Sequence, residues 1–306
     1  MSSDPPIVLA HFTEAYTFRS TAELLRNVCT VANFIFSPDK IKVAKSGSDN
    51  SALTIWEINT NELTKYEYNA YDDDGQQLKE FSAGFNTSEL NNKTKIIGKK
   101  DGMFLYITPG SNQFTVQIIS GKTRPNANYV PIIEEPVQEY EIPEYIRKES
   151  DPNIRIPATD FAKMCSNMVS TKCTMVKFIG YPNGVKCIGL LSSQQTGRVD
   201  HFGTCSYVDT QTKGNLDELF QSLSFDNINV ESKPSGIKIV LKSQEDLNSI
   251  TVKTAPIIKA MSRFNNLSVS GVVKLYIQEK KPLKIHINIG TYGGLTIFLR
   301  DMSQPI

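Results

Sequence analysis

The segment that divides this chain is Gly121–Pro152, with the sequence GKTRPNANYVPIIEEPVQEYEIPEYIRKESDP. It contains five prolines, seven acidic residues and four basic residues. Proline removes a backbone donor and fixes φ, so we expect a segment with this many prolines to run extended over a surface. A connection of this length inside a compact protein is normally either functional or disordered. Because it lies near the middle of the chain, it predicts a linker between two domains.

The sequences on the two sides of this linker resemble each other. Helical periodicity occurs at 19–32 and again at 158–169, and short strands joined by turns follow each of these predicted helices. A second pair of helices is predicted at 87–97 and 254–264, each before a strand of similar sequence. Each half is therefore predicted to be a strand, helix and meander unit used twice, which is typical of a repeat architecture.

The ends of the predicted elements in the first half follow from polar residues and alternation. Ser20 or Thr21 is predicted to cap the first helix, and Thr87 or Ser88 the second. Alternating apolar residues predict that 113–119 is the last strand before the linker, with no strand inside the linker itself.

The composition is that of a soluble globular protein. The chain has 306 residues, 40% hydrophobic and 21% charged, which is enough for two domains with cores. No apolar run is long enough to span a membrane, and the first residues lack the pattern of a secretory signal. Five cysteines without a Cys-x-x-Cys pair favour reduced thiols in an intracellular protein. Since the net charge is only +1, any contact with DNA must come from the distribution of charge.

Four short segments follow one another in an informative order. Glu141–Pro143 reads Glu-Ile-Pro, and Ile156–Cys165 combines a strand, a proline and a helix with the pattern Phe-Ala-basic-x-Cys. Lys281–Leu283 carries a Pro-Leu pair before an alternating strand, and Leu295–Leu299 is an apolar strand near the end. In order and spacing they resemble the connector, the start of domain two, the late hairpin and the last strand of the proliferating cell nuclear antigen family of DNA sliding clamps.

The resemblance implies an α+β DNA-clamp fold, in which helices line the hole of a ring and sheets form its outside. It divides the chain into an N-terminal clamp domain at 1–120, an interdomain connector at 121–152 and a C-terminal clamp domain at 153–306. The chain is longer than a typical clamp and less acidic. Such divergence fits a clamp of a large DNA virus.

The resemblance also implies a set of DNA-facing cations on the helices. The matching positions are Arg19, Arg26, Lys93, Lys95, Lys163, Lys259 and Arg263. Amine and guanidinium contacts to phosphate give sequence-independent binding that depends on salt. The alternative is that these residues form the solvated faces of amphipathic helices. Glu23 and Glu89 lie among them, which favours a weak, sliding contact over a tight one.

A second implied site is an apolar groove that accepts short peptides with aromatic anchors from polymerases, ligases and nucleases. The matching residues are Ser46, Leu53, Tyr140, Ile142, Pro143, Pro282, Phe298 and Leu299. An exposed apolar patch with a polar rim is a common sign of a protein-binding surface. Packing in the core is the alternative for Phe298 and Leu299. Ser46 replaces a bulkier family residue, which changes the expected shape of the groove.

A third implied site is the seam between subunits, where an edge strand at Gln113–Ile119 would pair with a neighbour's strand at about 198–207. The residues assigned to it are Gln113, Thr115, Gln117, Ile119, His201, Gly203 and Cys205. An unpaired edge favours aggregation, and closing a ring removes it.

No pattern of catalytic residues occurs in the sequence. Ser120–Thr123 resembles the end of a phosphate loop, but it lacks the first glycine and precedes prolines instead of a helix. His11, His201 and His286 lie in separate segments without Cys or carboxylate at ligand spacing, so no zinc site is expected. The sequence predicts a protein with no cofactor, no metal and no enzymatic activity.

The leading hypothesis is a homotrimeric ring that encircles duplex DNA and tethers replication and repair proteins to it. Its expected partners are double-stranded DNA without sequence preference, a DNA polymerase and other proteins with clamp-binding peptides, and a clamp loader, with no membrane. Its expected location is the intracellular site of DNA replication, either the nucleus or a cytoplasmic viral replication site. The alternatives are a monomeric or dimeric processivity factor, one subunit of a hetero-ring, or a duplicated α+β scaffold that binds proteins and does not encircle DNA.

Overall fold

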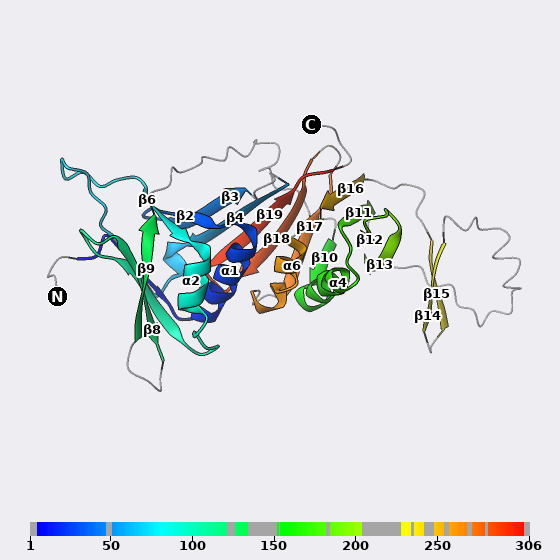
Figure 1. Cartoon of the computed structure of the whole chain (residues 1–306), viewed down its shortest axis with the longest axis horizontal. Coiled ribbons are helices and arrows are strands. Elements are labelled where there is room, and N and C mark those ends of the chain that lie inside the picture. The colour runs from blue at the N-terminus through cyan, green and yellow to red at the C-terminus, as the bar shows by residue number, and fades with distance from the viewer. Residues whose placement is uncertain are drawn as a thin grey trace, which may run out of the picture.

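Figure 1 shows a computed structural model of the chain. It describes residues 5–46, 51–120, 126–133, 152, 154–181, 184–203, 228–233, 236–241, 248–253, 257–267, 271–278 and 281–302.

The strands of the first half are β1 (Val8–Phe12), β2 (Val31–Phe36), β3 (Lys40–Ser46), β4 (Ala52–Asn59), β5 (Lys65–Tyr68), β6 (Phe81–Asn86), β7 (Gly102–Ile107), β8 (Gln113–Ile119) and β9 (Asn126–Ile133). Those of the second half are β10 (Ile154–Pro157), β11 (Met175–Tyr181), β12 (Gly184–Leu190), β13 (Thr196–Gly203), β14 (Ile228–Lys233), β15 (Gly236–Leu241), β16 (Asn248–Lys253), β17 (Val272–Tyr276), β18 (Leu283–Ile289) and β19 (Gly293–Leu299). The helices are α1 (Ala15–Val28), α2 (Thr87–Thr94), α4 (Ala158–Ser170) and α6 (Ile257–Met261), with short 3-10 helices η1 (Thr60–Glu62) and η3 (Phe264–Asn266).

A sheet of 13 strands joins the two halves, in the order β10-β17-β18-β19-β4-β3-β2-β6-β9-β8-β7-β1-β5. The halves meet where β19 pairs antiparallel with β4, from Gly293 opposite Ile58 to Leu299 opposite Ala52. A second sheet has the order β13-β12-β11-β16, and β14 pairs with β15 as a separate hairpin. Because hydrogen bonds between strands cross the boundary, the two halves share one continuous outer layer.

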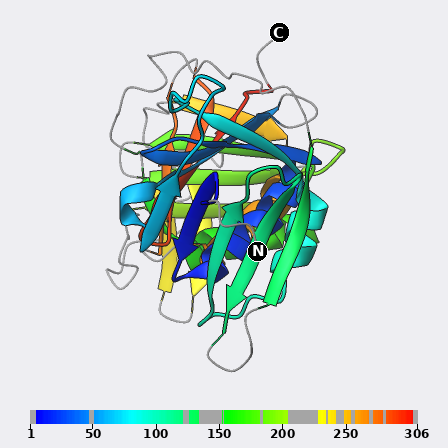
Figure 2. The same ribbon diagram turned by 90° about the vertical axis from the view of Figure 1, so that its left-hand side faces the viewer.

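The helices lie side by side on one face of this layer (Figure 1). Helix α1 contacts α2 on one side and α6 on the other, and α6 in turn contacts α4. The row therefore runs α2, α1, α6, α4 and draws equally on both halves. In Figure 2, strands β8 and β9 face the viewer at the N-terminal end of the molecule.

The core lies between the helices and the sheets. In the first half, α1 buries Phe18 against Trp56 and Phe34, with ring centroids 5.3 and 6.4 Å apart. In the second half, Phe161 of α4 stacks on Phe264 of η3 at 5.8 Å. Burial of aromatic and aliphatic side chains at helical spacing is the main force that holds each helix on its sheet.

Helix α1 begins earlier than its sequence predicts. It starts at Ala15, whose backbone N–H donates to the carbonyl of Asp101 at 3.2 Å. Ser20 and Thr21, the predicted caps, lie inside the helix and donate to the carbonyls of Tyr16 and Thr17, each at 3.0 Å. A partner from a distant loop thus sets the helix start, which local residues could not reveal.

Helix α2 is capped by the residue before the predicted caps. The side chain of Asn86 accepts from the backbone N–H groups of Ser88 and Glu89 at 3.0 and 3.1 Å. The hydroxyl of Thr87 donates instead to the carbonyls of Cys29 and Thr30. Asparagine is among the strongest N-caps, so the cap itself is ordinary. The helix ends at Thr94, earlier than the predicted 97.

The range 121–152 contains a strand that its prolines obscured. Strand β9 pairs with β8 from Asn126 to Pro131 and with β6 at Ile132 and Ile133. Val130 is fully buried, so the strand contributes to the core. Proline is tolerated within sheets at edge strands, and over 126–131 β9 has no second neighbour among the described residues. The domain boundaries at 120 and 152 remain predictions.

Candidate nucleic-acid interface

The row of helices presents a group of exposed cations from both halves. Arg26 lies in α1, Lys93 and Lys95 at the end of α2, Lys163 in α4 and Lys259 in α6. All five are exposed, and none forms an ion pair within the described part of the chain. Exposed cations without an ion-pair partner can attract phosphate without reading bases.

The other two predicted cations have partners inside the molecule. The guanidinium of Arg19 is half-buried, and its Nη1 donates to the carbonyl of Ile97 at 2.7 Å. The Nε of Arg263 lies 3.8 Å from the Oε1 of Glu23, so this pair links α1 to the segment after α6. Arg19 thus holds the loop after α2, and the charge of Arg263 is partly neutralised.

Three of the predicted groove residues form a continuous row on the outer face of the sheet. Ser46 of β3 is opposite Leu53 of β4, and Leu53 is opposite Phe298 of β19. Leu53 is half-buried and Phe298 is 8% exposed. Pro282, also half-buried, lies just before β18, whose Lys284 continues the row beside Phe298. The row crosses the boundary between the two halves.

Leu299 does not belong to this row. It is 1% exposed and shares the inner face of β19 with Leu295 and Ile297, both fully buried. Successive side chains of a strand point to opposite faces, so Phe298 and Leu299 cannot share a surface. The assignment of Leu299 to the groove is therefore wrong. Tyr140, Ile142 and Pro143 lie outside the described residues.

The seam assigned to Gln113–Ile119 requires a correction, because β8 is not an edge strand. It pairs with β7 on one side and with β9 on the other. The prediction that Gln113, Thr115, Gln117 and Ile119 form the seam through their backbone is therefore wrong. The open edge belongs to β9, which sequence analysis placed in the linker. The aromatic and β-branched residues Tyr129, Val130, Ile132 and Ile133, which favour strands, are the signal that could have identified it.

The other half of the predicted seam lies at an edge, as expected for pairing with a neighbour. Strand β13 pairs with β12, including Lys186 opposite His201 and Gly184 opposite Gly203, and has no other partner among the described strands. Cys205 lies outside the described residues. Val199 of β13 and Tyr129 of β9 are 37% and 53% exposed, so each open edge carries an exposed apolar side chain.

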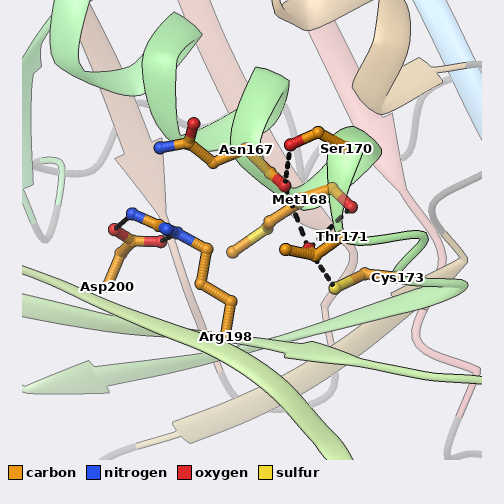
Figure 3. Close-up of polar contacts among 7 residues, drawn as sticks. All are labelled: Asn167, Met168, Ser170, Thr171, Cys173, Arg198 and Asp200. Atoms are coloured by element: carbon orange, nitrogen blue, oxygen red, sulfur yellow. Dashed lines mark hydrogen bonds and ion pairs between the residues drawn. The ribbon is translucent and has the colours of Figure 1, made fainter.

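An ion pair within strand β13 lies beneath the end of α4 (Figure 3). Arg198 donates to Asp200 through Nε at 2.6 Å and through Nη2 at 2.9 Å. These hydrogen bonds raise the pKa of Arg198 above its usual value. Above the pair, Ser170 and Thr171 donate to the carbonyl of Asn167 and close the last turn of α4. The first set of bonds lies within β13 and the second at the end of α4, so both elements are locally ordered where they approach each other.

Other classes of site are not found among the residues that the structure describes. No cluster of three or more His, Cys, Asp or Glu side chains there has the arrangement of a metal site. None of the described helices has the length and apolar character needed to cross a bilayer.

Solved structures decide which fold this arrangement represents. The proliferating cellular nuclear antigen of Entamoeba histolytica superposes with a TM-score of 0.69 and 14% identity, covering 96% of this chain and 98% of that one. This chain has the sliding-clamp fold. A PCNA2–PCNA3 complex from Sulfolobus tokodaii contains a second example, with a TM-score of 0.68, 12% identity, and coverage of 97% and 100%. No protein-family profile and no curated protein sequence matches the chain.

The clamp fold confirms the predicted α+β class and the resemblance on which it was based. At 12–14% identity the likeness concerns the backbone, so the roles of individual side chains must be argued from this chain. Two exposed cations that were not among the predicted DNA-facing residues, Lys99 and Lys100, lie in the loop after α2. Two adjacent lysines after Gly98 are visible in the sequence, but only the fold brings Lys99 to 6.0 Å from the ring of Tyr16 in α1.

Proposed function

We propose that this chain is a DNA sliding clamp, a non-enzymatic factor that encircles duplex DNA and tethers a polymerase and other replication and repair proteins. The observation that carries the proposal is the single row of helices α2, α1, α6 and α4 with unpaired cations from both halves. A curved layer of sheet behind cationic helices suits sequence-independent contact with phosphate, which permits sliding.

Ring formation is supported by the two open edges. Strand β9 and strand β13 lie toward opposite ends of the molecule in Figure 1. Two different surfaces on one chain produce a head-to-tail contact, and such contacts close into a ring when the rotation between copies permits. We propose a homotrimer closed by β9 of one copy on β13 of the next.

The test measures the mass of the assembled protein and asks whether its binding to DNA requires a free DNA end. Light scattering after size exclusion should give a mass near three chains over a range of concentrations. A linear duplex with free ends should then retain the protein at low salt, because a ring can thread onto an end. The same duplex with both ends blocked by streptavidin should not retain it. Equal retention on both duplexes, or a single-chain mass at all concentrations, would contradict a closed homomeric ring.

A hetero-ring is the second candidate. It is favoured by the similarity to one chain of a complex between two different clamp subunits. In that case this chain alone would be smaller than a ring, and its β9 and β13 edges would pair with a different partner. Mixing with the candidate partner should then restore both the ring mass and the dependence on free DNA ends.

The row of Ser46, Leu53 and Phe298 is proposed as the surface that accepts partner peptides. An apolar row with polar neighbours on the outer face suits an aromatic anchor. Its position on β3, β4 and β19 keeps a bound partner away from the helices. A tethered enzyme could therefore act on DNA while the helices contact the duplex.

A further inference from the structure

An open hollow lies beside the first turn of α1, where the two halves of the chain meet. It has a volume of about 350 Å³ and is lined by Glu14, Tyr16, Thr17, Lys99, Asn265 and Asn266. Its walls come from the start of α1, the loop after α2, and η3 of the second half. A volume of this size lies within the range of small-molecule sites.

An aromatic ring with two neighbouring cations forms one wall of the hollow. The centroid of Tyr16 lies 5.3 Å from the guanidinium carbon of Arg19 and 6.0 Å from the Nζ of Lys99. Arg19 is fixed by its hydrogen bond to Ile97, whereas Lys99 and the adjacent Lys100 are exposed. An aromatic surface beside mobile cations is the combination that binds single-stranded nucleic acid, by stacking on bases and attracting phosphates.

The lining of the hollow also includes polar groups that suit the edge of a base. The side-chain amides of Asn265 and Asn266 make no hydrogen bond within the described part of the chain, and each offers donors and an acceptor. The exposed carboxylate of Glu14 adds further acceptors. Because Glu14 balances the charge of Lys99 inside the hollow, an uncharged base fits better there than a phosphate does.

We propose that this hollow binds one unpaired base of single-stranded DNA. Tyr16 provides the stacking surface, Asn265 and Asn266 contact the base edge, and Lys99 and Lys100 contact the flanking phosphates. The inference rests on the proposed function, because DNA that passes along the helices continues as a single strand wherever synthesis is incomplete. The hollow would hold that strand at the rim of the ring.

The first experiment measures fluorescence anisotropy of the full chain with a labelled oligothymidylate of about 12 nucleotides. Tyr16→Leu is expected to weaken binding of this oligonucleotide roughly 5- to 150-fold, since that is the range for loss of one stacked base. Binding of a duplex of the same length should stay unchanged. Tyr71→Leu is the matched control, because Tyr71 is 55% exposed and lies outside the hollow.

A second variant keeps the test decisive if Tyr16→Leu fails to fold. Lys99→Ala changes an exposed side chain and should lower the salt dependence of oligonucleotide binding by about 0.7 in the log–log slope. A wild-type slope in Lys99→Ala would overturn the proposal. So would wild-type affinity in folded Tyr16→Leu, or an equal loss of single-stranded and duplex binding in that variant.

Cross-linking separates contact with a base from contact with a phosphate. An oligonucleotide carrying 5-iododeoxyuridine should cross-link to Tyr16 on irradiation, as identified by mass spectrometry of the digested protein. A cross-link only to residues outside the hollow would contradict the proposal. Retention on duplex with free ends tests the ring independently, so failure of the hollow and failure of the clamp function give different results.

Discussion

The hydroxyl of Tyr292, in the turn between β18 and β19, is hydrogen-bonded to the hydroxyl of Thr17 in α1, 275 residues away in the sequence. The Tyr292 ring is 4% exposed and packs edge-on against Phe12 with centroids 5.3 Å apart. Gly290 adopts a φ of 53°, and a Cβ there would come within 2.9 Å of the ring. The last hairpin of the chain is therefore anchored to its first helix.

Removing this hydroxyl should have a modest effect on stability. Tyr292→Phe deletes the hydrogen bond, but the hydroxyl of Thr17 keeps its bond to the carbonyl of Glu14 at 2.7 Å. No buried donor is left unpaired, so we expect a loss of about 1 kcal/mol in the free energy of unfolding. Urea denaturation measures it. A loss above about 3 kcal/mol would mean that Tyr292 holds the halves together in a way the hydrogen bond does not explain.

The same residue predicts a dependence on alkaline pH. Burial raises the pKa of Tyr292 above its ordinary value, which is about 10 in an unfolded chain. Above about pH 10 the unfolded chain loses this proton while the folded protein retains it, so the contribution to stability falls as pH rises. The melting temperature of the wild type should fall more steeply above this pH than that of Tyr292→Phe. Parallel curves would contradict the assignment.

Ring closure should depend on the outward-facing backbone of β9. The backbone N–H of Ile132 donates to the carbonyl of Asn112, just before β8. Backbone N–H groups alternate between the two sides of a strand, so those of the even-numbered residues of β9 point toward β8 and that of Ala127 points toward the open edge. Ala127→Pro removes one outward N–H without disturbing the β8 ladder. We expect it to reduce the assembled mass to a single chain in light scattering. Ala127→Thr keeps the N–H and should assemble normally; a ring that survives Ala127→Pro would place the seam elsewhere.

Contacts between the helices and DNA should appear in the salt dependence of duplex binding. Arg26→Ala and Lys163→Ala each remove one exposed, unpaired cation from the row of helices. Each is expected to reduce the log–log slope by about 0.9 if it contacts a phosphate. Lys79→Ala is the control, since Lys79 is also exposed but lies in the loop before β6. An equal effect in the control would show that total charge, and not the helix face, determines binding.

Leu53 and Leu299 should respond in opposite ways to truncation. Leu299 is buried on the inner face of β19, so Leu299→Ala should lower the free energy of unfolding by about 2–5 kcal/mol. Leu53→Ser changes the half-buried outer row and should alter stability much less. It should instead weaken binding of a synthetic peptide with two aromatic anchors roughly tenfold, as measured by calorimetry. Unchanged peptide affinity would exclude this row as the partner surface.

Much of the clamp architecture could be read from local patterns. Alternation placed β8 at 113–119, and helical spacing placed α4 at 158–169 against an observed end at Ser170. These predictions succeed because the periodicity of burial is a property of each segment alone. The start of α2 at Thr87 was predicted correctly, whereas its end at Thr94 and the start of α1 at Ala15 were not. The start of α1 depends on a hydrogen bond to Asp101, which is far away in the sequence.

For the candidate sites, the features that the sequence predicts differ more clearly from those that only the folded structure reveals. The duplicated α+β plan and the cationic helices could be predicted from the sequence, because both follow from residue types at regular spacing. The folded arrangement alone reveals that Arg19 and Arg263 have internal partners and that Leu299 faces the core. It also reveals that β9 carries an open edge among the described strands. Edges, pairings and hollows depend on which distant segments become neighbours, and that information is not present in any single stretch of the chain.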